Sequence, residues 1–311
     1  MSSRLMVVIA LSGVLMGLAA CGPKATPTPT PVSPVATLAQ SDTATRPADG
    51  MVMVYVPGGE SRLGSDDSEV DLALEMCNQY YGECEREWFE VEQPAHVVLL
   101  DGFWMDKTEV TNAQYRRCVD LGGCTPPSSN SSDTRSSYFG DSAYDNYPVV
   151  YVSWSQANAY CTWAGARLPT EAQWEYAARG PEGRRYPWGN DYDGARLNSC
   201  DVTCDYDWAD NAYEDGYADT APVGSYPDGA SWCGAQDLAG NVWEWTADWY
   251  GEYSSERQVN PTGPASGSLR ALRGDAADGT RSVSRNAARH GESPSRTYEY
   301  LGFRCASSDQ E

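Results

Sequence analysis

Apolar residues recur at helical spacing in three segments of the chain, and each segment starts with the same polar signal. Ser or Thr stands at the start and Gln follows three residues later, which is the reciprocal capping box of a helix N-terminus. A glycine suited to a left-handed helix end closes each segment. The pattern predicts helices that begin at Thr111, Ser153 and Thr170 and that end at Gly122, Gly165 and Gly180. In the second helix Trp154, Ala157, Cys161 and Ala164 share one face, so Cys161 is expected to point inward.

Strands are expected where apolar runs lie between turn residues. His96–Asp106 is predicted to form a strand pair with its turn at Asp101-Gly102. Further strands are predicted at Val242–Ala247 and Leu301–Ala306. The stretch 183–240 is dense in Gly, Pro, Asp and Tyr, and it should form long loops held by cysteines, tight turns or ions.

The first twenty residues have a different pattern, with Arg4 followed by an apolar run from Leu5 to Ala20. Such a run is too short for a comfortable membrane span and is typical of a signal peptide. It ends in Leu-Ala-Ala-Cys21, which resembles the bacterial lipobox, where the cysteine is acylated before cleavage. We therefore expect residues 1–20 to be removed and Cys21 to carry a lipid. The alternative is an ordinary secretory signal that is cut after Ala20.

Residues 21–50 are rich in Pro, Thr, Ser and Ala and contain almost nothing that could form a core. They are predicted to be an extended, disordered tether. Residues 51–311 are expected to form one domain. The lipid would then hold this domain on the extracytoplasmic face of a bacterial membrane, in the cell envelope.

The formal net charge of −22 argues against a nucleic-acid partner and against docking on anionic lipid headgroups, because phosphate would be repelled. Solubility is the simplest use of this charge, and binding of hard cations through oxygen is another. The 11 Trp and 20 Tyr against 4 Phe predict a core of amphipathic rings whose N–H and O–H groups need partners.

Ten cysteines in an exported chain indicate disulfides. The close spacings suggest three local bridges, Cys77 with Cys84, Cys118 with Cys124, and Cys200 with Cys204. Cys161, Cys233 and Cys305 remain, and one of these must be unpaired or bonded elsewhere. The histidines, His96 and His290, are far apart in sequence, so a zinc or copper site built on histidine is not expected.

Several long motifs resemble the sulfatase-modifying-factor family, whose best-known members are the formylglycine-generating enzymes. They are ARLPTEAQWEYAARG at 166–180, YPWG at 186–189, TAPVG at 220–224, DLAGNVWEW at 237–245 and LGFRC at 301–305. The motifs occur in the family's order, and the resemblance extends over roughly residues 51–307. It implies an α+β domain with a modified C-type-lectin fold, rich in loops, with short helices and small antiparallel sheets. It also implies a disulfide between Cys161 and Cys305, which leaves Cys233 odd.

The resemblance further implies two calcium ions, bound by side-chain and carbonyl oxygens as a hard cation prefers. One group of ligands falls on Asp237, Gly240, Val242 and Glu244, and the other falls on Asn198, Ser199, Asp215 and Tyr217. Asp237 stands where the family has Asn. The alternative is that these acids are turn caps and solvated loop residues.

Copper, in contrast, is not expected. The family's oxidases hold Cu(I) between two thiolates, and a soft ion of this kind needs sulfur. Counting back from Arg289 without gaps, the two positions fall on Ala276 and Arg281. The chain has no cysteine between Cys233 and Cys305, so no shift of the alignment restores even one ligand. Cys233 itself is expected to be a small buried residue or to compete within the Cys200/Cys204 pair.

A group of basic residues near the same stretch is a candidate ligand pocket for a carboxylate, phosphate, sulfate or acidic peptide. It consists of Arg281, Arg285, Arg289, His290 and Arg296. The alternative is that they neutralise nearby Asp and Glu and brace the fold. These features favour a non-oxidase binding or scaffolding domain for a protein, peptide or glycan. A formylglycine-generating oxidase, another enzyme in the same cleft, and a structural role in envelope assembly are the competing hypotheses.

Overall fold

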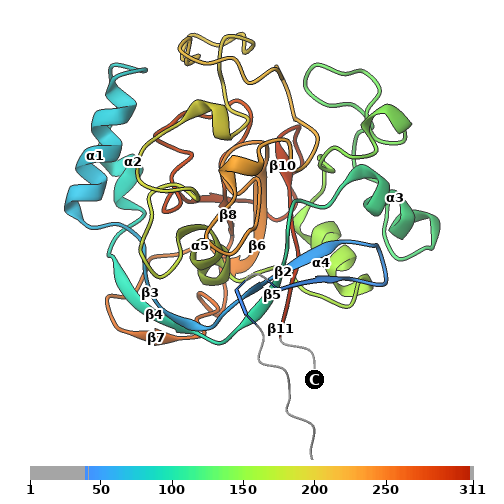
Figure 1. Ribbon diagram of the computed structural model, residues 1–311, viewed down its shortest axis with the longest axis horizontal. Coiled ribbons are helices and arrows are strands. Elements are labelled where there is room, and N and C mark those ends of the chain that lie inside the picture. Colours follow the sequence, from blue (N-terminus) through green and yellow to red (C-terminus); the bar gives the residue numbers. More distant parts are fainter. Residues whose placement is uncertain (1–38, 41, 309–311) are drawn as a thin grey trace, which may run out of the picture. The chain divides into compact units, whose positions relative to one another are not determined.

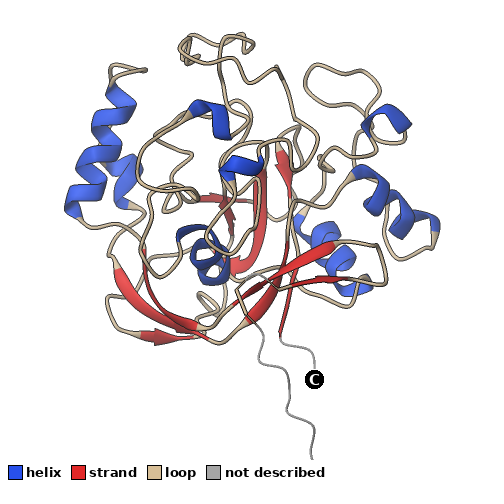
Figure 2. Ribbon diagram, viewed as in Figure 1, coloured by secondary structure: helices blue, strands red, loops and turns tan. Residues whose placement is uncertain are grey.

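The computed structural model describes residues 39, 40 and 42–308, and within this part short helices surround three small sheets (Figures 1 and 2). Its α-helices are α1 (Asp67–Asn78), α2 (Glu87–Glu90), α3 (Asn112–Asp120), α4 (Trp154–Trp163) and α5 (Glu171–Arg179). Figure 2 shows that much of the chain between these elements runs in loops.

The three predicted helices, α3, α4 and α5, are confirmed. Each cap side chain accepts a hydrogen bond from the backbone N–H three residues on, and the cap's own N–H donates to the Gln side chain. Gly122, Gly165 and Gly180 follow the helices with positive φ angles of 76°, 79° and 69°. The sequence did not predict α1, whose capping box is made by Asp66 and Glu69 instead of Ser or Thr with Gln.

The strands form two four-stranded sheets and one three-stranded sheet among the described residues. The first, in the order β1-β2-β5-β11, contains Thr43–Thr45, Val52–Val56, Phe103–Asp106 and Ala306–Ser308. The second, β10-β6-β8-β9, contains Leu301–Gly302, Trp243–Trp249, Arg270–Arg273 and His290–Glu292. The third, β3-β4-β7, contains Gly59–Leu63, His96–Leu100 and Gln258–Val259.

The predicted pairing within His96–Asp106 is wrong, although both strands exist. β4 pairs with β3 and β7, whereas β5 pairs with β2 and β11 in another sheet. The segments 52–63 and 96–106 instead form one antiparallel ribbon that bends at Gly58 and Gly102. The two segments approach so closely at the bend that a Cβ at Gly58 would lie 2.7 Å from the Gly102 nitrogen. The two residues between the strands therefore make a corner between sheets and not a hairpin turn.

The predicted strand at Leu301–Ala306 is likewise divided. β10 runs parallel to β6, and β11 runs antiparallel to β5, so the segment passes from one sheet to another. Arg304 lies at the crossing and is fully buried. A single apolar run thus links the two four-stranded sheets through a charged residue.

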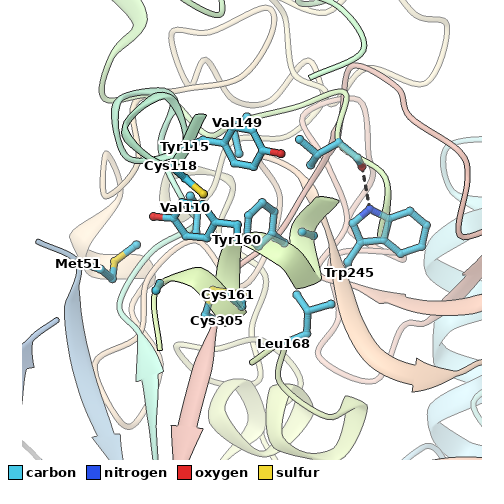
Figure 3. Packing of buried hydrophobic residues seen from close by; sticks show 14 of the residues in the cluster. Met51, Val110, Tyr115, Cys118, Val149, Tyr160, Cys161, Leu168, Trp245 and Cys305 are labelled. Carbon is cyan, nitrogen blue, oxygen red and sulfur yellow. Dashed lines mark hydrogen bonds between the residues drawn. A yellow bond between two sulfur atoms is a disulfide. The ribbon is translucent and has the colours of Figure 1, made fainter. Parts of the chain in front are cut away.

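The largest apolar cluster lies between α3, α4 and the sheets, and it contains the Cys161–Cys305 disulfide (Figure 3). Tyr115 and Tyr160 stack there with ring centroids 5.6 Å apart. The buried indole of Trp245 donates a hydrogen bond of 2.9 Å to the carbonyl of Val152 (Figure 3). The core is therefore built from amphipathic rings with polar partners, as the composition predicted.

The disulfides join the pairs that the spacings and the resemblance predicted. They are Cys77–Cys84, Cys118–Cys124, Cys161–Cys305 and Cys200–Cys204. Among the described residues Cys233 is the free cysteine, and it is buried.

The predicted end of the tether at residue 50 is too late. Thr43–Thr45 forms β1 and pairs with β2. Arg46 is buried and makes ion pairs of 2.6 Å with both Asp49 and Asp106. A Thr-Ala-Thr segment suits a strand, and its composition alone did not reveal the partner.

The predicted signal peptide, Cys21 and most of the tether lie outside the described residues. Within the described part, none of the helices has the length and apolar character that crossing a membrane requires.

Candidate functional site

The loop that connects β8 to β9 holds the two positions that the resemblance matches to the copper thiolates. Ala276 is fully buried in a small apolar cluster with Ala277 and Tyr300, against which Trp243 packs. Its methyl group has no lone pair for a metal ion, so this position contributes packing alone.

Arg281, at the second position, is held by an ion pair and by two aromatic rings. Its Nη2 atom lies 2.5 Å from Oδ2 of Asp210. The guanidinium carbon lies 4.6 Å from the ring centroids of both Tyr80 and Tyr192, a cation–π arrangement. Cys200 lines the same small enclosed space. A long cationic side chain with its own partners therefore stands at the position that the resemblance matches to a copper thiolate.

The remaining sulfur atoms are committed elsewhere. Cys305 is bonded to Cys161 in the core, and Cys200 is bonded to Cys204 beside Arg281. The Cys233 thiol lies against the carbonyl of Ala177, and burial raises its pKa. The predicted buried role of Cys233 is thus confirmed.

The five basic residues do not line a common pocket, so the prediction of a shared ligand pocket is wrong. Arg285 forms a buried ion pair with Glu92 at 2.5 Å, and Arg289 forms one with Glu171 at 2.7 Å. Burial alone would raise the pKa of Glu171, but Arg289 and Arg273 lower it to about 2. Buried carboxylates that the sequence pattern did not locate have drawn these arginines into the interior.

The other members of this basic group lie apart from those ion pairs. Arg281 is bound to Asp210, as described above. His290, on β9, and Arg296 are exposed to solvent. The alternative of charge neutralisation therefore describes Arg281, Arg285 and Arg289.

The calcium ligands expected at Asn198, Ser199, Asp215 and Tyr217 do lie together. Asp215 accepts hydrogen bonds of 2.9 Å from the backbone N–H groups of Ser199 and Tyr217. Burial raises the pKa of Asp215 to about 7. Asn198 is buried, and its Oδ1 atom has no hydrogen-bond partner. A half-buried carboxylate beside a buried, unpaired amide oxygen is an arrangement that a hard cation would satisfy, so this group fits calcium.

The calcium ligands expected at Asp237, Gly240, Val242 and Glu244 lie next to the Asn198 group. Gly240 approaches Asn198 so closely that a Cβ there would lie 2.0 Å from the Asn198 carbonyl oxygen. Asp237 is buried, and burial raises its pKa. Glu244 is also buried, but its carboxylate is bound by Arg304 at 2.7 Å and by the Trp174 indole at 2.9 Å. Asp237 therefore fits a calcium site, whereas Glu244 already has other partners.

Side chains alone do not form a metal shell in the part of the chain that the structure describes, since no three His, Cys, Asp or Glu residues converge suitably. Any ion at either group would depend on backbone carbonyl oxygens as well, as calcium sites commonly do. The resemblance already assigned such carbonyls at Ser199, Tyr217, Gly240 and Val242.

A further cavity, of about 490 Å³, lies between the start of α5 and the loop 251–264. His96, Asp248 and Tyr253 line it. Asp248 accepts a hydrogen bond from the backbone N–H of Glu171, and burial together with the Glu171 charge raises its pKa to about 7. The sequence did not single out Asp248, because it follows a Trp-rich strand motif without any partner nearby in sequence.

Taken with the fold, these groups define a loop-rich α+β domain of the C-type-lectin-like class, in which the small closed space around Arg281 and Asp210 is also lined by the disulfide-bonded Cys200. The chain belongs to the family described as "Sulfatase-modifying factor enzyme 1-like domain", whose model matches residues 37–309.

Relatives of the family include active and inactive members. The chain is 34% identical over 313 residues to the formylglycine-generating enzyme of Streptomyces coelicolor, covering 87% of this chain and 94% of that protein. It is 44% identical over 167 residues to the inactive C-alpha-formylglycine-generating enzyme 2 of Mus musculus, covering 52% of this chain and 49% of that protein.

Among solved structures, PvdO from Pseudomonas aeruginosa superposes with a TM-score of 0.68 and 22% identity, covering 88% of this chain and 100% of that one. Treponema denticola variable protein 1 superposes with a TM-score of 0.63 and 22% identity, covering 86% of this chain and 98% of that one. These likenesses confirm the predicted C-type-lectin-like fold.

Proposed function

We propose that this protein is a non-oxidase member of its family that binds a protein, peptide or glycan in the cell envelope. The observation that carries the proposal is the ion pair of Arg281 with Asp210, at the position that the resemblance matches to a copper thiolate, with the guanidinium also in contact with the rings of Tyr80 and Tyr192. Ala276 at the other position offers no ligand at all. A Cu(I) ion would find neither of the sulfur atoms that it needs there.

The proposal extends to the location of the protein. A lipid on Cys21 would hold the domain at the extracytoplasmic face of a membrane, and the tether would give it reach. Metabolic labelling with an alkyne-tagged fatty acid tests this directly. Wild-type chain should incorporate the label and Cys21→Ser should not; labelling of both, or of neither, would contradict the anchor.

Calcium forms part of the proposal as a structural ion. The unpaired Asn198 Oδ1 atom supports it, because a buried polar atom is costly to leave without a partner, and the half-buried Asp215 carboxylate lies close to it. Bound calcium would hold the loops around residues 198–217 and 237–244 in place. The melting temperature should fall when a chelator is added, and an unchanged value would remove calcium from the account.

The partner is proposed to be something other than nucleic acid, since the net charge of −22 opposes phosphate backbones. Photo-crosslinking on intact cells, followed by mass spectrometry, would identify what contacts the domain. Cross-links confined to lipid would favour a purely structural role in the envelope.

The oxidase remains as a second candidate because Cys200 lines the same small space as Arg281. If the Cys200–Cys204 disulfide were reduced, two thiols would lie beside the cleft. The variant Cys200→Ser separates the two functions, since it would abolish an oxidation that depends on this pair and would leave ligand binding in place.

The deciding experiment is a peptide oxidation assay. Full-length protein is supplied with Cu(I) and oxygen under reducing conditions, together with a cysteine-containing sulfatase-type peptide, and the products are analysed by mass spectrometry. The Streptomyces coelicolor enzyme serves as the positive control. We expect the peptide to keep its thiol, and formation of an aldehyde that depends on the protein would overturn the proposal.

A further inference from the structure

The cavity between the start of α5 and the loop 251–264 contains a buried carboxylate without an ion-pair partner. Asp248, near the end of β6, is 3% exposed and lines this cavity. Its Oδ2 atom accepts a hydrogen bond of 2.7 Å from the backbone N–H of Glu171. Within the part of the chain that the structure describes, no donor reaches its Oδ1 atom. Half of the acceptor capacity of this carboxylate is therefore open.

Two other charged residues in the cavity wall satisfy each other. Arg289 binds both oxygens of Glu171, at 2.7 and 2.9 Å. Its Nη1 atom donates to the carbonyls of Val91 and Gly251. Glu171 also accepts a hydrogen bond from the hydroxyl of Tyr253. An anionic ligand would have to compete with Glu171 for the guanidinium, so the cavity does not favour a carboxylate or a phosphate.

His96 adds a second acceptor to the same wall. It is 5% exposed, and its Nδ1 atom lies 3.1 Å from the carbonyl oxygen of Pro94. A carbonyl oxygen can only accept, so Nδ1 carries the proton and Nε2 of the neutral ring is left as an acceptor. None of the described residues donates a hydrogen bond to Nε2. Asp248 and His96 therefore both offer acceptors to a ligand that carries N–H or O–H donors.

The rest of the wall gives the cavity an apolar side and keeps Asp248 open. The apolar lining residues are Leu63, Ala172, Val259, Pro261 and Pro264. A Cβ at Gly263 would lie 2.8 Å from Oδ1 of Asp248, so any side chain there would cover this oxygen, and glycine leaves it open. The volume of about 490 Å³ lies in the range of small-molecule sites.

We propose that this cavity binds a primary ammonium group on an alkyl chain, with Asp248 as the anion that pairs with it. An ammonium group has one positive charge and three donors, which match the open carboxylate oxygen and the neutral imidazole of His96. The apolar side of the cavity suits the methylene stem. A neutral polyol, in contrast, would leave the charge of Asp248 unpaired.

The charge of the whole protein supports a cationic ligand. The net charge of −22 and the exposed Glu252, which also lines the cavity, favour the approach of a cation. A lysine side chain of a protein partner and a free alkylamine both carry the proposed group. The inference adds a site to the proposed function and does not depend on the absence of oxidase activity.

The test measures the binding of pentylamine to the full-length wild type and to Asp248→Asn by isothermal titration calorimetry at pH 8. At this pH Asp248, whose pKa burial and the Glu171 charge raise to about 7, is mostly ionised. Asparagine keeps an acceptor for the Glu171 N–H and removes the charge. We expect pentylamine to bind the variant at least about tenfold more weakly than the wild type.

The matched control is Glu256→Gln, which removes a charge from an exposed position of the same loop outside the cavity wall. It should bind pentylamine as the wild type does. Equal binding by the wild type and Asp248→Asn, or no binding by the wild type, would overturn the assignment.

Two further probes separate the ammonium group from its stem and identify its source. Pentan-1-ol has the same chain without the charge and should bind at least about tenfold more weakly than pentylamine. Equal affinity would mean that the cavity recognises an apolar chain, and the proposal would fail. Nα-acetyl-lysine methylamide carries the ammonium group on a peptide-like backbone. Tighter binding of this derivative would assign the site to a partner's lysine, tighter binding of pentylamine would assign it to a free amine, and both results support an ammonium site.

Discussion

Arg281 donates a hydrogen bond to Asp210 across 2.5 Å, and this ion pair lies at a position that the resemblance matches to one of the two copper thiolates of the family's oxidases. The rings of Tyr80 and Tyr192 both contact the guanidinium, with centroids 4.6 Å from its carbon atom. The guanidinium and its partners therefore satisfy one another. Under the proposed function, a Cu(I) site here would require removing this arrangement as well as supplying cysteines.

The double variant Ala276→Cys/Arg281→Cys should gain the ability to bind Cu(I), because it places two soft ligands at the matched positions. Each single variant offers one thiolate and should bind the ion at least tenfold more weakly. A competition titration against a colorimetric Cu(I) chelator measures this. Equal binding by the double and single variants would mean that residues 276 and 281 do not face one site.

The disulfide in the core, Cys161–Cys305, and the disulfide beside Arg281, Cys200–Cys204, should differ in their effect on stability. Cys161–Cys305 closes a separation of 144 residues, and Cys200–Cys204 closes one of 4. In the chain-entropy model, removal costs about 5 kcal/mol for the first and about 2 kcal/mol for the second. Urea unfolding of Cys161→Ala/Cys305→Ala and Cys200→Ala/Cys204→Ala compares them, and a reversed order would contradict the chain-entropy account.

Asp248 should make the protein less stable as the pH rises toward neutrality. Its pKa is about 7 in the folded protein, through burial and the Glu171 charge, and about 4 in an unfolded chain. Between these values the folded state holds the extra proton, so the free energy of unfolding decreases with increasing pH.

Asp248→Asn removes this dependence and keeps an acceptor for the Glu171 N–H. Relative to wild type, it should gain about 1 kcal/mol or more between pH 5 and pH 8. Urea unfolding at both pH values checks this. Asp120→Asn, at an exposed site, is the matched control and should follow the wild type. A parallel pH dependence in Asp248→Asn and wild type would refute the shifted pKa.

Breaking the ion pair between Arg304 and Glu244 should be strongly destabilising. Arg304→Met leaves a buried carboxylate without its partner, which typically costs about 3–5 kcal/mol. The double variant Glu244→Gln/Arg304→Met removes both charges and should recover part of that loss. Chemical unfolding of the three proteins forms the test, and no recovery in the double variant would show that packing, not charge, is what Arg304 supplies.

How far the sequence predicted this structure depends on how local each signal is. The capping boxes at Thr111, Ser153 and Thr170 are complete within four residues, and all three helices were located correctly. The disulfides at close spacing were equally local. In contrast, the partner of β4 depends on a bend at Gly58, some forty residues earlier, and strand periodicity carries no information about it.

The same distinction explains the errors at the candidate site. The arginines at 281, 285 and 289 were recognised as a basic group, but their partners Asp210, Glu92 and Glu171 are between 71 and 193 residues away in sequence. A cluster of like charges in sequence therefore became three separate ion pairs in the fold. Glu109 is buried and accepts a hydrogen bond from the side chain of Asn241, and it escaped notice for the same reason, because Asn241 is 132 residues away in sequence.

The central claim is that this member of the family has no thiolate site for copper. The most direct measurement is a titration of the full-length wild-type protein with Cu(I) in the presence of a competing chelator, with the Streptomyces coelicolor enzyme measured alongside. We predict that this protein will not take Cu(I) from the chelator. The Streptomyces coelicolor enzyme, titrated in parallel, should take it. Stoichiometric capture of Cu(I) by this protein at affinities comparable to the enzyme would contradict it.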